Sequence, residues 1–150
     1  MKFSTTRFGT LEIPDEEILY FPLGVFGFPS ILRYVILNHN MESPLRWLQS
    51  IDKPDLAFPI IPAAELGGEY AITVPSEDLF ALQLASSGDG LTFVILTIPK
   101  DAPEQTTANL RAPIVINTTE HLARQILTVE EYPIRYLLAE GQPATVECAG

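Results

Sequence analysis

Short runs of alternating or uniformly apolar residues follow one another along most of the chain, with turn residues between them. The clearest run covers 91–98, which is rich in β-branched residues and ends at Pro99. Such runs are typical of strands that are buried on one or both faces. Gly9 lies between the first two runs and predicts an opening hairpin. We predict strands over 2–8, 10–13, 18–21, 33–37, 45–51, 56–61, 70–74 and 91–98.

Helices are expected to be few and short. Thirteen prolines are spread along the chain, and a proline inside a helix removes a backbone donor and clashes with the preceding turn. The one good helix candidate begins at Ser76, which we expect to cap the free amides. Glu77 and Asp78 follow in the first turn, where acidic side chains complement the helix dipole.

The segment 109–127 has an asparagine at each end of its apolar run, Asn109 before it and Asn117 after it. Residues 122–127 fit either a helix or the second strand of a hairpin with a four-residue loop, and we prefer the hairpin. The count of strands is then eight to ten. The fold class is mainly β: one domain over 1–138, built as a small antiparallel barrel or sandwich with one or two short helices. Residues 139–150 are expected to form a flexible tail.

Charge narrows the possible partners. The chain has 19 acidic and 9 basic residues, which give a formal net charge of −10. Such a field repels nucleic acid and anionic membranes and favours basic proteins, although the charge alone is also explained by solubility. A single cysteine, Cys148, excludes an internal disulfide and fits a reducing compartment. Because no signal-peptide or membrane-spanning run is present, we expect a cytoplasmic protein.

Residues that could carry chemistry are scattered. His39 and His121 are far apart and no cysteine accompanies them, so no metal site is predicted. Asp52 and Asp55 lie in a turn region, where carboxylates are ordinarily solvated rather than paired for acid–base work. We therefore expect no catalytic residue, metal or cofactor. The alternative is a small barrel enzyme or ligand-binding protein that uses scattered carboxylates.

Several large side chains lie where they could serve either the core or a partner. Phe26 and Phe28 belong to a loop rich in glycine and proline, and their rings either close one end of the barrel or contact another protein. Trp47 and Gln49 share one strand face by their period of two. Trp47 is either a core residue or an anchor on an exposed sheet surface.

Five stretches together resemble the bacterial flagellar assembly factor family FliW: "TRFGTLEI", "FPLGVFGF", "RWLQSIDKPDLAFPI", "TIPKDAPEQTTANLRAPIVIN" and "RQILTVEEYPIRYLL". The resemblance runs from about residue 6 to 138. It implies a cytoplasmic β-barrel-like protein without enzymatic activity, expected here to be a monomer. It also implies two partners, flagellin and the translational repressor CsrA, and no direct contact with nucleic acid or membrane.

The resemblance and the residue patterns together suggest where partners bind. We expect Asn109 and Arg111 to lie at or beside a partner-binding edge, because Arg111 brings a charge where the family commonly has an apolar residue. Asn117 is expected to support the turn that follows it. The full set of residues that we predict to contact partners is Phe26, Phe28, Trp47, Gln49, Asp55, Asn109, Arg111 and Asn117.

Overall fold

The computed structural model describes residues 1–150 except 39–42, 67–69, 139–141 and 144–150. Its strands are β1 (Lys2–Thr5), β2 (Gly9–Glu12), β3 (Leu19–Tyr20), β4 (Arg33–Asn38), β5 (Arg46–Ser50), β6 (Ala57–Pro62), β7 (Leu91–Thr97), β8 (Thr107–Asn117), β9 (Leu122–Gln125), β10 (Tyr136–Leu137) and β11 (Gln142–Pro143). Its helices are α1 (Ser76–Leu82) and four short 3₁₀ turns, η1 (Asp15–Glu17), η2 (Ala63–Leu66), η3 (Ser87–Asp89) and η4 (Pro103–Gln105).

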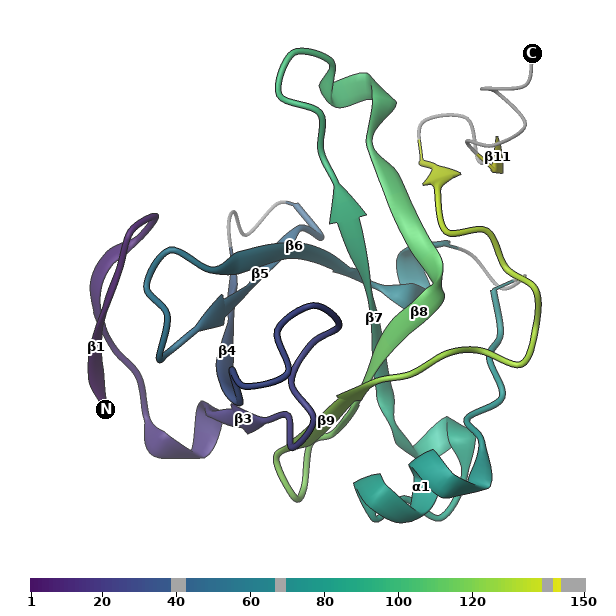
Figure 1. Ribbon diagram of the computed structural model, residues 1–150, viewed down its shortest axis with the longest axis horizontal. Coiled ribbons are helices and arrows are strands. Elements are labelled where there is room, and N and C mark those ends of the chain that lie inside the picture. Colours follow the sequence, from purple (N-terminus) through teal and green to yellow (C-terminus); the bar gives the residue numbers. More distant parts are fainter. Residues whose placement is uncertain (39–42, 67–69, 139–141, 144–150) are drawn as a thin grey trace.

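Seven strands close into a barrel in the order β8-β7-β6-β5-β4-β3-β9, with β9 pairing back onto β8. All these pairs are antiparallel except β3 with β9, where Tyr20 lies beside Leu122 in a parallel arrangement. The 11-residue β8 makes closure possible because it pairs with β7, β9 and β10 along its length. Figure 1 shows β8 running along one side of the barrel, from the extended β7–β8 arm down to β9.

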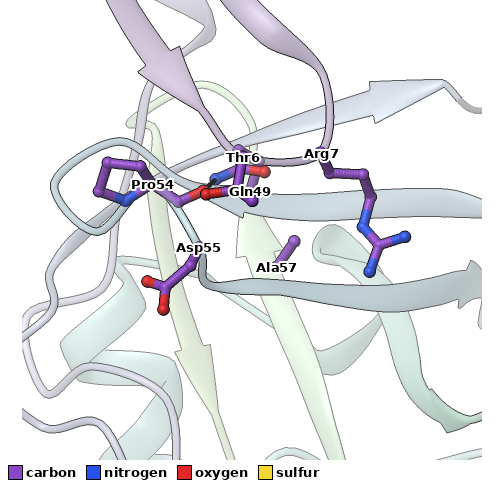
Figure 2. Close-up of a pocket in the computed structure, with 6 residues that line it drawn as sticks. All are labelled: Thr6, Arg7, Gln49, Pro54, Asp55 and Ala57. Atoms are coloured by element: carbon purple, nitrogen blue, oxygen red, sulfur yellow. Dashed lines mark hydrogen bonds between the residues drawn. The ribbon is translucent and has the colours of Figure 1, made fainter.

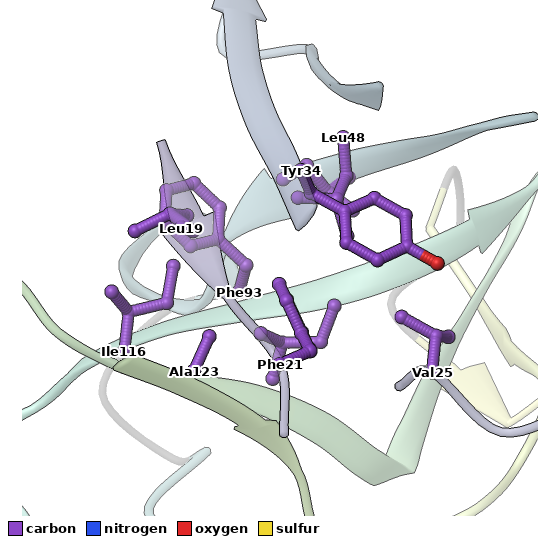
Figure 3. Packing of buried hydrophobic residues seen from close by; sticks show 10 residues of the cluster. Leu19, Phe21, Val25, Tyr34, Leu48, Phe93, Ile116 and Ala123 are labelled. Carbon is purple, nitrogen blue, oxygen red and sulfur yellow. The ribbon is translucent and has the colours of Figure 1, made fainter. Parts of the chain in front are cut away.

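The barrel interior is filled by apolar side chains that alternate along each strand. Tyr34 and Leu48 come from neighbouring strands and both are completely buried. The ring of Phe21 packs edge-on against Tyr34, with 4.9 Å between ring centres. Figure 3 shows these residues converging with Phe93 and Ile116 from the other side of the barrel. Burial of such side chains is the main stabilising contribution to the fold.

Two elements cover outer faces of the barrel. The β1–β2 hairpin, purple in Figure 1, stands outside the barrel beside β4 and β5. Its Phe3 packs with Val35 and Ile51 in a separate apolar cluster. On another side, α1 places Leu82 against Val115 of β8. No helix in the described ranges is long and apolar enough to cross a membrane.

The mainly β barrel, the opening hairpin and the hairpin of β8 with β9 confirm the sequence predictions. The described residues form eleven strands rather than eight to ten, because several pairings involve only two residues. Pro59 is tolerated inside β6 because it pairs with Trp47 on one side only, and pairing with β7 begins at Ile60.

Two local predictions were wrong. Residues 70–74 form no strand, because side chains rather than a neighbouring strand bind their backbone: Val74 N donates to Ser87 Oγ at 2.9 Å. Ser76 does not cap α1, since Pro75 occupies the cap position and its carbonyl accepts the amides of Asp78 and Leu79. His39 lies outside the described residues. The predicted tail over 139–150 also lies outside them, except for the two residues of β11.

Candidate partner-binding sites

The eight residues that the sequence singled out do not form one surface. Trp47, Gln49 and Asp55 belong to β5 and the turn after it, close to the β1–β2 hairpin. Phe26 and Phe28 belong to the loop between β3 and β4. Asn109, Arg111 and Asn117 lie along β8. The three groups lie in different parts of the fold.

Trp47 lies on the outer face of β5 and is only 9% exposed. The hairpin covers it: the Phe8 ring meets it edge-on with 6.1 Å between ring centres. The guanidinium carbon of Arg7 lies 4.3 Å from the centre of the indole ring. This is a cation–π arrangement. Trp47 thus fixes the hairpin to the barrel, which agrees with the core alternative rather than with an exposed anchor.

Gln49 follows on the same face of β5 and is completely buried. Its Nε2 donates to the carbonyl oxygens of Ser50, Pro54 and Leu56, at 2.9, 3.2 and 3.2 Å. These bonds hold the turn between β5 and β6 in place. Gln49 also lines a cavity of about 410 Å³ with Thr6, Arg7, Pro54, Asp55 and Ala57, which Figure 2 shows between the hairpin turn and β6.

The turn between β5 and β6 carries paired charges. Asp55 is exposed, and its Oδ1 lies 3.2 Å from Lys53 Nζ. Asp52 accepts two hydrogen bonds from the Arg33 guanidinium, one of them from Nε at 3.0 Å. The hydrogen bond from Arg33 lowers the pKa of Asp52. Both carboxylates are exposed, as expected for turn residues, and each also has an ion-pair partner.

The loop over 21–32 is held rigidly and presents apolar side chains outward. Gly24 has a φ of +69°, and a Cβ there would lie 2.2 Å from the Phe28 carbonyl oxygen, so the turn requires glycine. The Phe26 amide donates to Gln125 Oε1 at 2.8 Å, which ties the loop to β9. Phe28 packs on Phe58, whereas Phe26 is 51% exposed. Phe28 thus helps to close the end of the barrel, and Phe26 faces solvent.

Asn109 and Arg111 lie at the bend of β8, beside the segment that leads to β10. Asn109 Oδ1 accepts the amides of Arg111 and Ala112, at 3.1 and 3.0 Å. Arg111 Nε donates to the Tyr132 carbonyl oxygen at 2.8 Å. Both side chains are half-buried and serve the fold at this edge. Their contact with a partner stays a prediction.

Asn117 confirms the role predicted from its position before the turn. Its Oδ1 accepts the amides of Thr119 and Glu120, at 3.0 and 3.1 Å. Its Nδ2 donates to the carbonyl oxygens of Leu82 and Gln83, at 2.8 and 3.2 Å. The second pair was not foreseen. It joins the β8–β9 turn to the end of α1, where helix carbonyls lack partners within the helix.

Sequence reasoning missed three residues that shape these sites. Arg7 and Thr6 were treated as part of a strand, yet they form the hairpin turn over Trp47 and Gln49. Gln125 was treated as part of an ambiguous segment, although its side chain bridges the 21–32 loop and Ala112. The alternation of 122–125 places Gln125 on a buried face, and a buried amide there is the one signal that could have indicated such a bridge.

The described residues contain no group of three or more His, Cys, Asp or Glu side chains that could hold a metal ion. The fold and these sites define a small closed barrel of mainly antiparallel strands. The FliW protein family matches residues 2–138 of the chain. The chain belongs to the FliW family, and its role is in flagellar assembly.

Individual relatives cover nearly the whole chain. The flagellar assembly factor FliW of Magnetococcus marinus is 36% identical over 140 residues, which are 93% of this chain and 86% of that relative. The FliW of Caldicellulosiruptor bescii is 39% identical over 134 residues, which are 89% of this chain and 87% of that relative. The crystal structure of a flagellar assembly factor FliW is similar with a TM-score of 0.83 and 34% identity, covering 92% of this chain and 96% of that one.

Proposed function

We propose that this protein is a cytoplasmic regulator without enzymatic activity, which acts as a monomer and binds two proteins in turn. Flagellin awaiting export occupies it first. When flagellin has left, the free protein binds the translational repressor CsrA and relieves repression of flagellin synthesis. Membership of the FliW family supports a role in flagellar assembly, and the identity of the two partners is our inference from the family resemblance.

The observation that carries this proposal is the distribution of charge. The net charge is −10, and acidic side chains are exposed around the fold, including Glu16, Glu77, Glu104 and Glu120. Such a surface repels the phosphates of RNA and attracts basic protein surfaces. A protein of this charge is suited to acting on an RNA-binding repressor through protein contacts rather than by competing for the RNA itself.

Exposed apolar side chains supply a second element that protein partners require. Phe26 and Leu23 project from a loop whose backbone is fixed by Gly24 and by the bond to Gln125. A rigid loop loses little conformational entropy when its aromatic ring is buried by a partner. We therefore place one contact of a partner at Phe26.

The carboxylates of the β5–β6 turn do not favour the alternative, a barrel enzyme that uses scattered carboxylates. Asp52 and Asp55 are the acidic residues nearest to each other in the β5–β6 turn, and each is engaged by its own cation. The cavity beside them holds one carboxylate, that of Asp55, and it is exposed rather than buried. A pair of carboxylates with different environments, as acid–base catalysis needs, is not formed there.

Calorimetric titration of the purified protein with flagellin and with CsrA, each alone, tests the proposal. Saturable binding of both is expected, while an unrelated protein of similar basic charge should not saturate it. Phe26→Ala should weaken the binding of at least one partner, whereas Phe80→Ala, which removes an even more exposed ring from α1, should not. Failure of both proteins to bind the native chain would overturn the proposal.

A further inference from the structure

Two buried side-chain oxygens among the described residues lack a hydrogen-bond partner, the hydroxyl of Tyr34 and the amide oxygen of Gln49. Gln49 Oε1 is shielded from solvent and accepts no hydrogen bond from the protein. The orientation of the amide is not arbitrary, because three carbonyl oxygens surround Nε2 and can only accept. Turning the amide over would bring Oε1 against those carbonyls. A buried polar group without a partner is rare in folded proteins and calls for an explanation.

The space beside Gln49 is larger than a structural water requires. The cavity that Gln49 lines has a volume of about 410 Å³. One water molecule occupies about 30 Å³ in the liquid, whereas ligand pockets begin at roughly 300 Å³. The cavity is therefore of a size that accepts a short piece of another molecule. Figure 2 shows its walls, with Thr6 and Arg7 on the hairpin turn and Ala57 on β6 opposite.

The rim of the cavity supplies donors to complement the acceptor within. Arg7 stacks its guanidinium over Trp47, and within the described ranges its N–H groups donate to no protein oxygen. A stacked guanidinium keeps its N–H edges free for a carbonyl or carboxylate. The cavity thus presents an acceptor at Gln49 and a planar donor at Arg7.

We infer that this cavity binds an amide group, –CO–NH–, of a partner polypeptide, with its N–H donated to Gln49 Oε1 and its carbonyl accepting from Arg7. This inference rests on the proposed function, in which the protein binds other proteins. A lysine side chain would meet Arg7 and the nearby Lys53 with like charge. A carboxylate would satisfy Arg7 but leave Gln49 Oε1 without a donor. An amide satisfies both groups and adds no charge.

Gln49 Oε1 has almost no surface accessible to solvent, so an amide reaches it only if the turns around it shift. One backbone hydrogen bond joins the hairpin turn to the β5–β6 turn in the described residues, from Thr6 N to the Pro54 carbonyl oxygen at 2.9 Å. The rest of the hairpin is anchored separately by Phe3 in its apolar cluster. Phe8 and Arg7 of this turn also lie on Trp47, so a shift of the turn has to break these contacts while Phe3 keeps the hairpin attached to the barrel.

The test uses the intact protein and three small peptides, followed by the NMR signals of the Gln49 side-chain amide and of Arg7 Nε. The first is N-acetyl-glycyl-alanyl-glycine N-methylamide, which offers main-chain amides. The second has asparagine in place of alanine and adds a primary amide. The third is N-acetyl-prolyl-proline dimethylamide, which has carbonyls but no N–H. The first two, or the asparagine peptide alone, should shift both signals. The third should leave the Gln49 signal in place.

Variants connect those shifts to the cavity. Ala57→Leu fills the cavity and should weaken the binding of the peptides by at least about tenfold, because the amide then loses its hydrogen bonds to Gln49 and Arg7. Ala81→Leu makes the same change on the exposed face of α1 and should leave the titration unchanged. A Gln49 signal that no peptide moves means that water occupies the cavity, and this overturns the inference. Equal shifts from the proline peptide overturn it as well.

The same variants separate this inference from the proposed function. If the native protein binds flagellin and CsrA but Ala57→Leu binds both as tightly, and the peptides shift nothing, the proposed function stands and the amide site does not. If the peptides bind as expected while neither protein binds, the amide site stands and the identity of the partners is wrong.

Discussion

Replacement of Asn117 by alanine should destabilise the fold strongly without touching a partner surface. The side chain makes four hydrogen bonds: it donates to the carbonyls of Leu82 and Gln83 and accepts from the amides of Thr119 and Glu120. Alanine makes none of them. The change therefore releases the end of α1 and the β8–β9 turn from each other at the same time.

The magnitude follows from the four bonds and from their access to water. Each such bond contributes about 0.5–1.5 kcal/mol net, so the four together contribute about 2–6 kcal/mol. Gln83, Thr119 and Glu120 line a surface cavity, so water can replace part of what is lost. We expect a loss of about 2–4 kcal/mol in the free energy of unfolding. In a domain of this size that lowers Tm by roughly 5–15 °C.

Calorimetric melting and urea unfolding measure this loss, with Thr118→Ala as the matched control. Thr118 is exposed in the same turn, and its replacement should change the free energy of unfolding by about 0.5 kcal/mol or less. Binding of flagellin or CsrA per folded molecule should be unchanged in both variants. If Asn117→Ala melts like the control and loses a partner, Asn117 belongs to an interface and the structural reasoning is refuted.

Four other outcomes are expected. Trp47→Ala should cost about 3–5 kcal/mol in urea unfolding, and a normal Tm with loss of a partner would place the ring in an interface. Burial raises the pKa of Tyr34 to about 12, and its hydroxyl has no hydrogen-bond partner in the described residues. Tyr34→Phe should therefore leave the free energy of unfolding unchanged or raise it by up to about 1 kcal/mol. A decrease of more than about 1 kcal/mol would show that the hydroxyl has a partner. Arg33 lowers the pKa of Asp52 below its ordinary 3.8, so that ion pair stabilises the fold above about pH 4. This stabilisation is lost as the pH falls through the lowered pKa. The free energy of unfolding of Asp52→Asn should therefore fall less in acid than that of the native chain. The rate of association with CsrA should fall as the salt concentration rises, since screening acts over roughly 8–10 Å. A rate that does not change with salt would show that charge does not steer the association.

Local patterns in the sequence were enough to predict most of the strands and the main hairpins, but 70–74 is not a strand and the two-residue strands β10 and β11 were not predicted. Asn117 marked the β8–β9 turn because an asparagine at a strand end commonly bonds the backbone two residues on, and it does so here with Thr119. The sequence patterns fit a closed barrel and a sandwich equally well, so they do not predict whether the sheet closes. Closure depends on the pairing of Tyr20 with Leu122, two residues far apart in the chain that no local pattern relates.

The sites depended still more on contacts between distant segments. The period of two placed Trp47 and Gln49 on one face, but it could not show that a hairpin from the start of the chain covers that face. Likewise, the direction of the Gln49 side-chain amide is set by the following turn, because Nε2 donates to three of its carbonyl oxygens and Oε1 is left without a donor. Arg111 illustrates the same limit, since its bond to the Tyr132 carbonyl comes from the folded return of the chain.

The most direct test of the central claim follows the release of RNA from CsrA. A fluorescently labelled fragment of flagellin messenger is first bound to CsrA, and its anisotropy is recorded as this protein is added. We expect the anisotropy to fall to that of free RNA and to rise again when flagellin is added, because flagellin reoccupies the protein. RNA that stays bound to CsrA at saturating protein, or a release that flagellin does not reverse, would contradict the account.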